Sequence, residues 1–190
     1  MSTFTTHIKG HVLIKDKATG EILLDKNNAV HNKNMAITLA RALSNSDGSS
    51  IYRIWLGNGG SSVDSLGQVI YQSPNVTGST ANLYNPTYQE IVDEGDVSAG
   101  LGNTVTYQES PAPDETTIVI CSATLSTSEP SGQAVTDSDT LDSTSASYAF
   151  DELGLFTSDG KLLSHIIFSP ILKTQNRELI ITYTLTIAVS

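Results

Sequence analysis

Cysteine, long apolar runs and charge are all scarce in this sequence of 190 residues. The single cysteine, Cys121, excludes an intrachain disulfide and any multi-cysteine zinc or iron–sulfur site. It lies in an apolar alternation, which predicts a buried structural thiol. No run of about 18 apolar residues is present, and the first ten residues lack the apolar core and cleavage site of a signal peptide. We therefore expect a chain that does not enter a membrane and stays in the compartment where it is made.

Basic residues are absent from a long central interval. All ten lysines and arginines lie outside Ile54–Gly160, whereas fifteen of the twenty acidic residues lie inside it. The interval carries a formal charge of −15, and the two ends together carry +5. An acidic middle argues against general nucleic-acid binding, because phosphate contacts come from clustered Lys and Arg. This separation of acidic from basic residues along the chain indicates either a solvated acidic insertion or complementary charge between copies in an oligomer.

The composition favours a β-protein. Charged residues make up 16% of the chain, and Thr, Ser, Gly and Asn are common, unlike in a helical bundle. We predict an all-β fold, a β-sandwich or barrel-like, with one short helix near residues 33–44 and long polar loops. The length suits a single domain. Its core is expected from about residues 1–60 and 148–190, with 61–147 as a loop-rich acidic insertion.

A hairpin, a helix and a short strand are predicted in the first 60 residues. Thr5–Ile14 and Glu21–Asp25 have strand patterns on either side of a turn-forming segment. Asn32 can cap a helix over Lys33–Leu43, and Ile51–Leu56 has the pattern of a strand. The apolar face expected for this helix consists of Ala36, Ile37, Ala40 and Leu43.

Polar segments dominate the centre, and the C-terminal part is more regular. Ser61–Gly102 is expected to be a long loop with room for one short helix, followed by a hairpin of Thr104–Gln108 and Thr116–Ser126. Thr127–Ser147 is too polar to bury a core and is expected to be a flexible loop. After residues 148–156, we predict a strand over Lys161–Ser169, a break at Pro170 and a final strand over Glu178–Val189. That last strand alternates between an apolar face and a mostly Thr face.

Candidate chemical groups are few. His7 and His11 share one face of a strand but stand about 13 Å apart, too far to share a metal ion. His31 beside the helix cap and His165 in the penultimate strand are expected to be satisfied or exposed histidines. Asp137–Asp142 offers oxygen ligands for calcium but lacks the spacing of an EF-hand loop.

Two further motifs fit structural roles better than catalytic ones. Gly57-Asn58-Gly59-Gly60 has no Lys and no following helix, so it indicates a turn that ends a strand rather than a phosphate loop. Asp151 and Glu152 are adjacent, so in a strand they face opposite sides and cannot act as a catalytic carboxylate pair. We expect them to cap a turn or to meet a basic neighbour. No catalytic, cofactor-binding or metal-binding residue is predicted, and the chain is not expected to be an enzyme.

Several segments at the two ends form a recognisable pattern. They are Gly10–Ile14, Asp16–Glu21, Asp25–His31, Ile54–Gly60 and Phe150–Phe156 with the hydrophobic hairpin after it. Over about residues 8–60 and 148–190 this pattern resembles β-rich virion structural proteins of tailed bacteriophages. The ending also resembles the strand pairs of phage tail, neck and baseplate-associated proteins. The middle of the chain matches no family in this way.

The resemblance implies a homo-oligomeric subunit of a ring or collar in the neck, tail or baseplate. It implies contacts with other virion proteins through edge strands and polar loops, and a location in the virion after synthesis in the host bacterial cytoplasm. No cofactor, specific nucleic acid or membrane partner is expected. The residues predicted for assembly contacts are Lys9, Lys15, Lys17, Lys161, Lys173, Arg177, Glu90, Asp93, Glu94 and Asp96.

Two alternatives stay open at this stage. One is a capsid decoration or fibre-type module that binds a receptor or glycan, since exposed aromatic rings can stack on sugars. The aromatic residues considered for that role are Trp55, Tyr71, Tyr84, Tyr88 and Tyr107. The other is a glycosidase that uses the central acidic residues.

Overall fold

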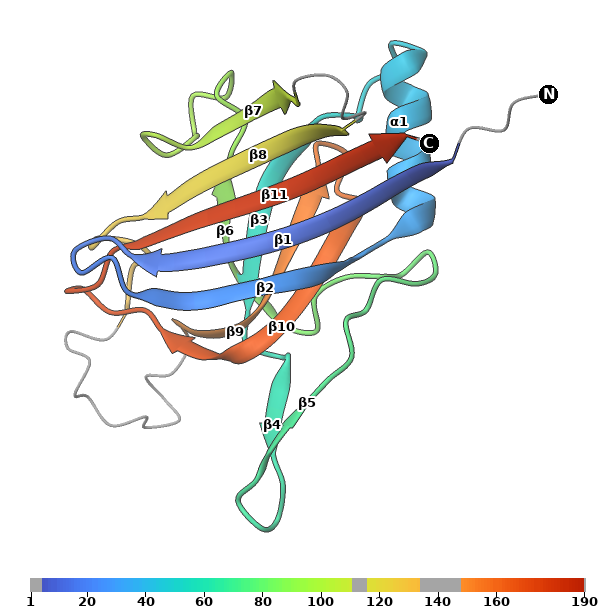
Figure 1. The fold of residues 1–190 in the computed structure, drawn as a ribbon. Helices are drawn as coiled ribbons and strands as arrows, with labels where there is room; N and C mark the ends of the chain where they lie inside the picture. Colours follow the sequence, from blue (N-terminus) through green and yellow to red (C-terminus); the bar gives the residue numbers. More distant parts are fainter. Residues whose placement is uncertain (1–4, 111–115, 134–147, 190) are drawn as a thin grey trace.

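The computed structural model describes residues 5–110, 116–133 and 148–189, and it shows an antiparallel sheet of nine strands that curls into a half-barrel (Figure 1). The strand order is β6-β3-β9-β10-β2-β1-β11-β8-β7. Its strands are β1 (Thr6–Asp16), β2 (Ile22–Val30), β3 (Ile51–Gly57), β6 (Pro86–Ile91), β7 (Thr104–Glu109), β8 (Thr116–Leu125), β9 (Ala149–Thr157), β10 (Leu162–Leu172) and β11 (Leu179–Val189). A separate hairpin of β4 (Ser61–Val63) and β5 (Val69–Tyr71) and the helix α1 (Asn32–Leu43) complete the fold. The predicted all-β class is confirmed.

β11 is the centre of one half of the sheet. It pairs with β1 from Leu179 to Val189, and with β8 along nearly the same length. Its alternation has the predicted consequence: one set of side chains is buried in the core, and the threonines on the other face remain partly exposed. The buried set is Leu179, Ile181, Tyr183 and Leu185.

The central part of the chain contributes strands to the sheet. β6 pairs with β3 at one edge, while β8 and β7 extend the sheet beyond β11 at the other. Buried side chains from this region, Val92, Cys121, Ala123 and Leu125, belong to the main core. The expectation that residues 61–147 form an insertion outside the core is therefore wrong for β6, β7 and β8. The alternation of β6 is short, and its pairing with β3, distant in the sequence, supplies the burial that it lacks alone.

Helix α1 forms where the sequence predicts it but turns a different face to the sheet. Met35 and Thr38 are buried, whereas Leu43, expected on the apolar face, is 90% exposed. The N-cap is His31 and not Asn32: its Nδ1 accepts a hydrogen bond from the Asn34 amide at 3.3 Å. In the part of the chain that the structure describes, no helix is long and apolar enough to cross a membrane.

β10 differs from its predicted form at Pro170. The strand continues to Leu172, and its pairing with β9 shifts register between Ile167 and Ile171. Because proline has no amide hydrogen to donate, a bulge is the form in which a strand accommodates it. The predicted break is therefore an irregularity within β10. Of the flexible loop predicted at Thr127–Ser147, residues 134–147, with the candidate calcium ligands Asp137–Asp142, lie outside the described residues.

Cys121 is a buried structural thiol, as predicted. It is 0% exposed on β8, and burial raises the pKa of its thiol to about 12. A thiol that is both inaccessible and protonated reacts slowly with disulfide reagents. We expect no reaction with Ellman's reagent in native protein and one thiol per chain in urea; full labelling of the native protein would contradict this burial.

Candidate assembly site

Residues 61–71, named here the arm, form a hairpin that leaves the half-barrel (Figure 1). Its two strands pair with each other and are not part of the nine-stranded sheet. The turn between them is built by Asp64, whose Oδ1 accepts hydrogen bonds from the amides of Leu66 and Gln68 at 2.8 Å each. Gly67 supplies the positive φ of 80° that the turn needs. The sequence thus encodes a defined hairpin in a region that alternation alone predicts as a loop.

The arm exposes apolar side chains. Leu66 at the turn is 81% exposed and Val63 is 67% exposed, although both side chains are aliphatic. Val69, Ile70 and Tyr71 are each about half exposed. Isolated exposed apolar residues are ordinary, but a contiguous group on a projecting element marks an interaction surface.

Asp151 holds the first residues of the arm. Its side chain is on β9, and Oδ1 accepts the Gly60 amide at 2.8 Å. Oδ2 accepts both the amide of Ser61 at 2.8 Å and its hydroxyl at 2.5 Å. The residue is 3% exposed, so these charge-assisted hydrogen bonds replace the water that the carboxylate loses on burial.

Glu152 holds the segments on either side of the arm. Its Oε1 accepts the amides of Gly59 at 3.2 Å and Asn85 at 2.7 Å, and its Oε2 accepts the amide of Tyr84 at 2.9 Å. The Nε2 atom of His165 lies 3.0 Å from Oε2 and makes the fourth hydrogen bond of this carboxylate. The side chains of Glu152 and His165 are both 0% exposed. Glu152 thus meets a basic neighbour, as expected, and it also binds irregular backbone that has no strand partner.

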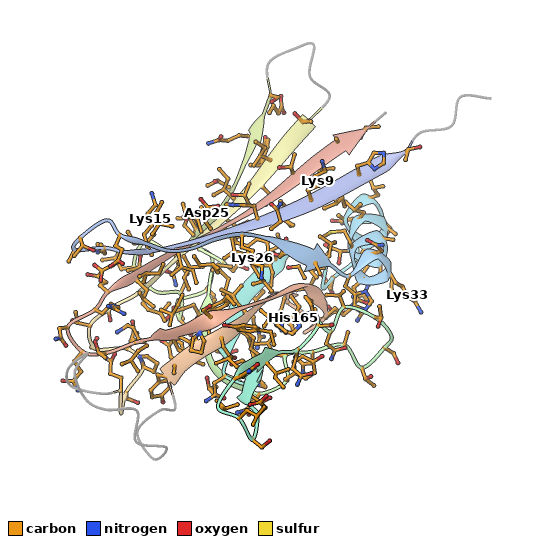
Figure 2. All side chains as sticks on the ribbon, turned by 60° about the horizontal axis from the view of Figure 1, so that its bottom comes forward. Lys9, Lys15, Asp25, Lys26, Lys33 and His165 are labelled. Carbon is orange, nitrogen blue, oxygen red and sulfur yellow. The ribbon has the colours of Figure 1, made fainter. Side chains whose placement is uncertain are left out.

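The His165 ring is hydrogen-bonded through both of its nitrogens. Its Nδ1 accepts the Asn75 amide at 2.9 Å, so the ring hydrogen lies on Nε2, which donates to Glu152. Figure 2 shows His165 on β10, and its side chain is fully buried. The ring therefore connects β10 to the segment of residues 72–85 that follows the arm. This satisfied histidine is the role that the sequence predicts for it.

Glycine is required where the β3 end meets the two carboxylates. A Cβ on Gly57 would lie 2.5 Å from both the Asn85 carbonyl oxygen and Glu152 Oε1, and a Cβ on Gly60 would lie 2.8 Å from the Asp151 carbonyl oxygen. Such approaches are shorter than any side chain tolerates. The segments Ile54–Gly60 and Phe150–Phe156, which the sequence places almost a hundred residues apart, are therefore two halves of one structure. We call Gly57–Ser61, Asp151, Glu152 and His165 the mount of the arm.

Further contacts tie down the arm base and the segment after it. The Gln72 amide donates to the Gly60 carbonyl at 2.8 Å, and the Tyr71 hydroxyl lies 3.0 Å from Ser169 Oγ on β10. His31, the helix cap, donates from Nε2 to the Gly78 carbonyl at 2.9 Å. The base of the arm is thus anchored to the body of the fold at both of its strands.

The pKa of the Glu152 carboxyl predicts how the mount responds to acid. Burial acts to raise this pKa, but hydrogen bonds from His165, Asn85 and Tyr84 outweigh it, so the pKa lies below its ordinary value of 4.5. A lowered folded-state pKa contributes stability that is complete above about 4.5 and is lost as the pH falls through the folded value.

We therefore expect the free energy of unfolding to fall on acidification below about pH 4.5, and to fall less steeply in Glu152→Gln. Urea unfolding between pH 3 and pH 7 measures both slopes. Equal acid slopes in the two proteins would contradict the assignment to Glu152.

Six of the ten predicted assembly contacts are engaged within the same copy. Some basic residues pair within the same copy: Lys17 with Glu178 at 2.5 Å, Lys161 with Asp159 at 2.5 Å, and Arg177 with Asp16 at 3.4 Å. Lys173 and Glu90 are buried, so they cannot touch another copy in this fold. The Lys173 ammonium donates to Gln133 and Thr174, and Glu90 accepts hydrogen bonds from Tyr88 and Asn103. Asp96 accepts a hydrogen bond from the Tyr52 hydroxyl.

The remaining four predicted contacts lie at the surface or partly exposed. Lys9 and Lys15 are on β1 and, among the described residues, neither has an ion-pair partner (Figure 2). Asp93 and Glu94 follow β6 and lie beside a cavity near α1. Sequence reasoning missed the arm itself, because its exposed Val, Leu and Ile are too few and too interspersed with polar residues to stand out.

The aromatic residues considered for sugar stacking do not form one platform. Trp55 packs on Phe156 with ring centroids 5.7 Å apart, and the hydroxyls of Tyr84 and Tyr88 are bonded within the chain. Tyr107 is 70% exposed on the edge strand β7. Within the described ranges, no group of three His, Cys, Asp or Glu side chains is placed to hold a metal ion.

The class that the fold and site define is a curled antiparallel half-barrel that carries a rigidly mounted apolar arm. No protein-family model, curated protein or solved structure matches the chain.

Proposed function

We propose that the chain is a non-enzymatic structural subunit of a tailed-bacteriophage virion, which self-associates into a ring or collar in the neck, tail or baseplate. The phage assignment rests on the sequence resemblance described above. Two of the segments that carry it, Ile54–Gly60 and Phe150–Phe156, build the mount of the arm. The proposal places the chain in the virion, in contact with other virion proteins, after synthesis in the host cytoplasm.

The arm is the observation that carries the proposal. Burying one Val, Leu or Ile side chain against a partner stabilises a complex by about 1.5–3 kcal/mol. Five partly exposed apolar residues on one projection therefore favour association strongly, and a pre-formed hairpin loses little conformational entropy when it docks. The mount supplies this rigidity.

The mount itself supports a structural role over a catalytic one. Asp151, Glu152 and His165 are buried, and their polar atoms serve backbone amides of the same chain. A catalytic acid or base has to reach a substrate within hydrogen-bond distance. A substrate could reach these groups after displacement of the segments whose amides they bind.

The two edges of the sheet offer a second mode of contact. In the described part of the chain, β6 and β7 are the edge strands of the nine-stranded sheet. The Ile91 carbonyl accepts a hydrogen bond from the Asn103 side chain and the Val105 amide donates to Glu94, so the other outer backbone groups are the ones that can extend the sheet into another chain. Virion neighbours of a different sequence can use these edges, while the arm serves contact between copies.

Purified protein at high concentration, imaged by negative-stain electron microscopy, tests the proposal. We expect closed rings of uniform size, and co-sedimentation with phage particles when the chain is expressed during infection. A monomer at every accessible concentration that is also absent from particles would overturn it. A monomer that binds components of a glycan array would instead support the receptor- or glycan-binding alternative.

A further inference from the structure

A cavity of about 550 Å³ lies between α1 and the inner face of the sheet. One side of α1 and residues of β3, β7, β8, β10 and β11 form its walls. Its volume lies within the range of about 300–1,000 Å³ that is typical of sites for small molecules. No residue of the arm or the mount lines it, and Figure 1 shows α1 beside the ends of β1 and β11, away from the arm. The cavity is therefore separate from the site described above.

The interior of the cavity is apolar. Met35, Leu163 and Leu185 line it and are at most 5% exposed. Further aliphatic side chains of this lining come from α1, β7 and β8, and they are Leu39, Val105 and Val119. Such a surface favours the apolar part of a ligand, because moving apolar groups out of water is favourable.

Two acidic residues lie where the cavity opens to solvent. Ala42, Ser50 and Glu94 line the cavity and are exposed, so they mark its mouth. Asp93, the neighbour of Glu94 in the sequence, also lines it and is partly exposed. Among the described residues, no Lys, Arg or His lines the cavity. A ligand whose apolar part enters the cavity therefore has its other end beside two negative charges.

Neither carboxylate is neutralised within the described chain. Glu94 Oε1 accepts the Val105 amide at 3.2 Å, and Asp93 Oδ1 accepts the Gly95 amide at 3.0 Å. No ion pair of Asp93 or Glu94 is found in the part of the chain that the structure describes. Each carboxylate thus has a second oxygen that can accept a hydrogen bond from a ligand.

The cavity wall also contains a hydroxyl group that the protein leaves unpaired. Thr38 lies on α1 one turn before Ala42, lines the cavity and is 9% exposed. Within the described ranges, its hydroxyl has no hydrogen-bond partner. Polar side chains buried to this extent are ordinarily hydrogen-bonded. A ligand that carries a hydrogen-bonding group offers this hydroxyl a partner.

We propose that the cavity binds a small amphiphilic cation, whose aliphatic chain packs between α1 and the sheet while its ammonium group lies at the mouth beside Asp93 and Glu94. Charge selects this class of ligand. An anion with the same chain is repelled by the two carboxylates, and a neutral alcohol gains only the burial of its chain. The inference goes beyond the assembly role and does not depend on it.

Methyl NMR at Met35 tests the proposal. The chain has two methionines, Met1 and Met35, so carbon-13 labelling of methionine methyl groups gives at most two signals, one of them from the cavity. Titrations at pH 7 compare n-octylammonium, n-octanol and n-octanoate, which share one chain length and differ in charge. We expect the Kd of octylammonium at the Met35 signal to be about 3- to 10-fold lower than that of octanol, as one or two partly exposed charge pairs provide. Octanoate should bind most weakly.

A charge-neutralising variant isolates the role of the carboxylates. Asp93→Asn combined with Glu94→Gln removes both charges and keeps the oxygens that accept the backbone amides. It should raise the Kd of octylammonium to that of octanol and leave the Kd of octanol unchanged. The matched control combines Glu21→Gln with Glu129→Gln, two exposed residues that do not line the cavity, and should bind octylammonium as the unaltered chain does.

A cavity-blocking variant locates the binding. Ala42→Trp introduces a large side chain at the mouth from an exposed position, and it should abolish the response of Met35 to octylammonium and octanol, with circular dichroism to check the fold. A Met35 signal that does not shift in the unaltered chain would overturn the proposal. Equal Kd values for octylammonium and octanol, or tighter binding of octanoate, would also overturn it. Unchanged octylammonium binding in the charge-neutralised variant would do the same.

Discussion

Replacing Glu152 with alanine should lower the free energy of unfolding by about 3–5 kcal/mol, the cost typical of removing one partner from a buried charged network. The carboxylate accepts hydrogen bonds from Gly59, Tyr84, Asn85 and His165. Without it, three backbone amides and the His165 Nε2–H group are left buried with no acceptor in their present positions. Each unsatisfied group costs about 1–3 kcal/mol, although relaxation and entry of water reduce the sum.

Urea unfolding at pH 7 measures this effect. Glu109→Ala is the matched control, because Glu109 is exposed on the edge strand β7 and its loss should change stability by no more than about 0.5 kcal/mol. The stability of Glu152→Gln should fall between the two, since the glutamine carbonyl oxygen can accept one pair of these hydrogen bonds, but its NH2 group, in place of the second carboxylate oxygen, cannot accept the other pair. Equal stability of Glu152→Ala and the Glu109→Ala control would show that the mount is not an energetic centre of the fold.

Replacing Leu66 and Ile70 together with aspartate should strongly weaken self-association while leaving the chain folded. Both side chains are half or more exposed in the single copy, so their loss removes little from its core. In an assembly each would be buried, and a buried Leu or Ile contributes about 1.5–3 kcal/mol. Since about 1.4 kcal/mol corresponds to tenfold in affinity, the double variant should associate at least about 100-fold more weakly.

Light scattering after size-exclusion chromatography gives the molar mass of the double variant across a range of concentrations, and circular dichroism checks its fold. Leu101→Asp is the control, because Leu101 is 101% exposed but lies outside the arm. We expect this control to assemble like the unaltered chain. If the Leu101 variant and the arm double variant lost assembly equally, exposed apolar side chains in general, rather than the arm, would account for association.

The part of the fold that sequence predicts best is the part with long, uninterrupted alternation. β1, β8 and β11 each have a buried face that period-two patterning identifies, and their predicted limits agree with the structure to within a few residues. β6 was missed because its six residues include Pro86 and the acidic Glu90, neither of which indicates a strand. Glu90 is nevertheless buried, and burial raises the pKa of its carboxyl while hydrogen bonds from Tyr88 and Asn103 act against that rise.

The helix shows how pattern and packing can diverge. Ala36, Ile37 and Ala40 form a plausible apolar stripe, but the sheet contacts the stripe of Met35 and Thr38 instead. At the helix start, the His31 ring caps the first turn and is itself held by the Gly78 carbonyl. Gly78 is 47 positions from His31, so this hydrogen bond leaves no periodic pattern in the sequence of the helix.

The mount was foreseen in its parts and not as a whole. A turn at Gly57–Gly60, a satisfied His165 and a basic neighbour for Glu152 all follow from local chemistry. The sequence does not show that these residues lie close together, because their proximity depends on β9 lying between β3 and β10 in the sheet. That strand order brings the carboxylates of β9 to the end of β3, where the glycines and the acidic pair form one hydrogen-bonded site.

Hydrogen exchange of the backbone amides, measured by mass spectrometry on the assembled and the diluted protein, tests the central claim most directly. If the arm is the docking element, peptides covering residues 62–71 should exchange markedly more slowly in the assembly than in the dilute chain. The amides that Asp151 and Glu152 bind, at Gly60, Ser61 and Asn85, should be protected in both states, since the mount does not depend on a partner. Equal exchange of the arm in both states, with protection gained elsewhere on the surface, would contradict the account.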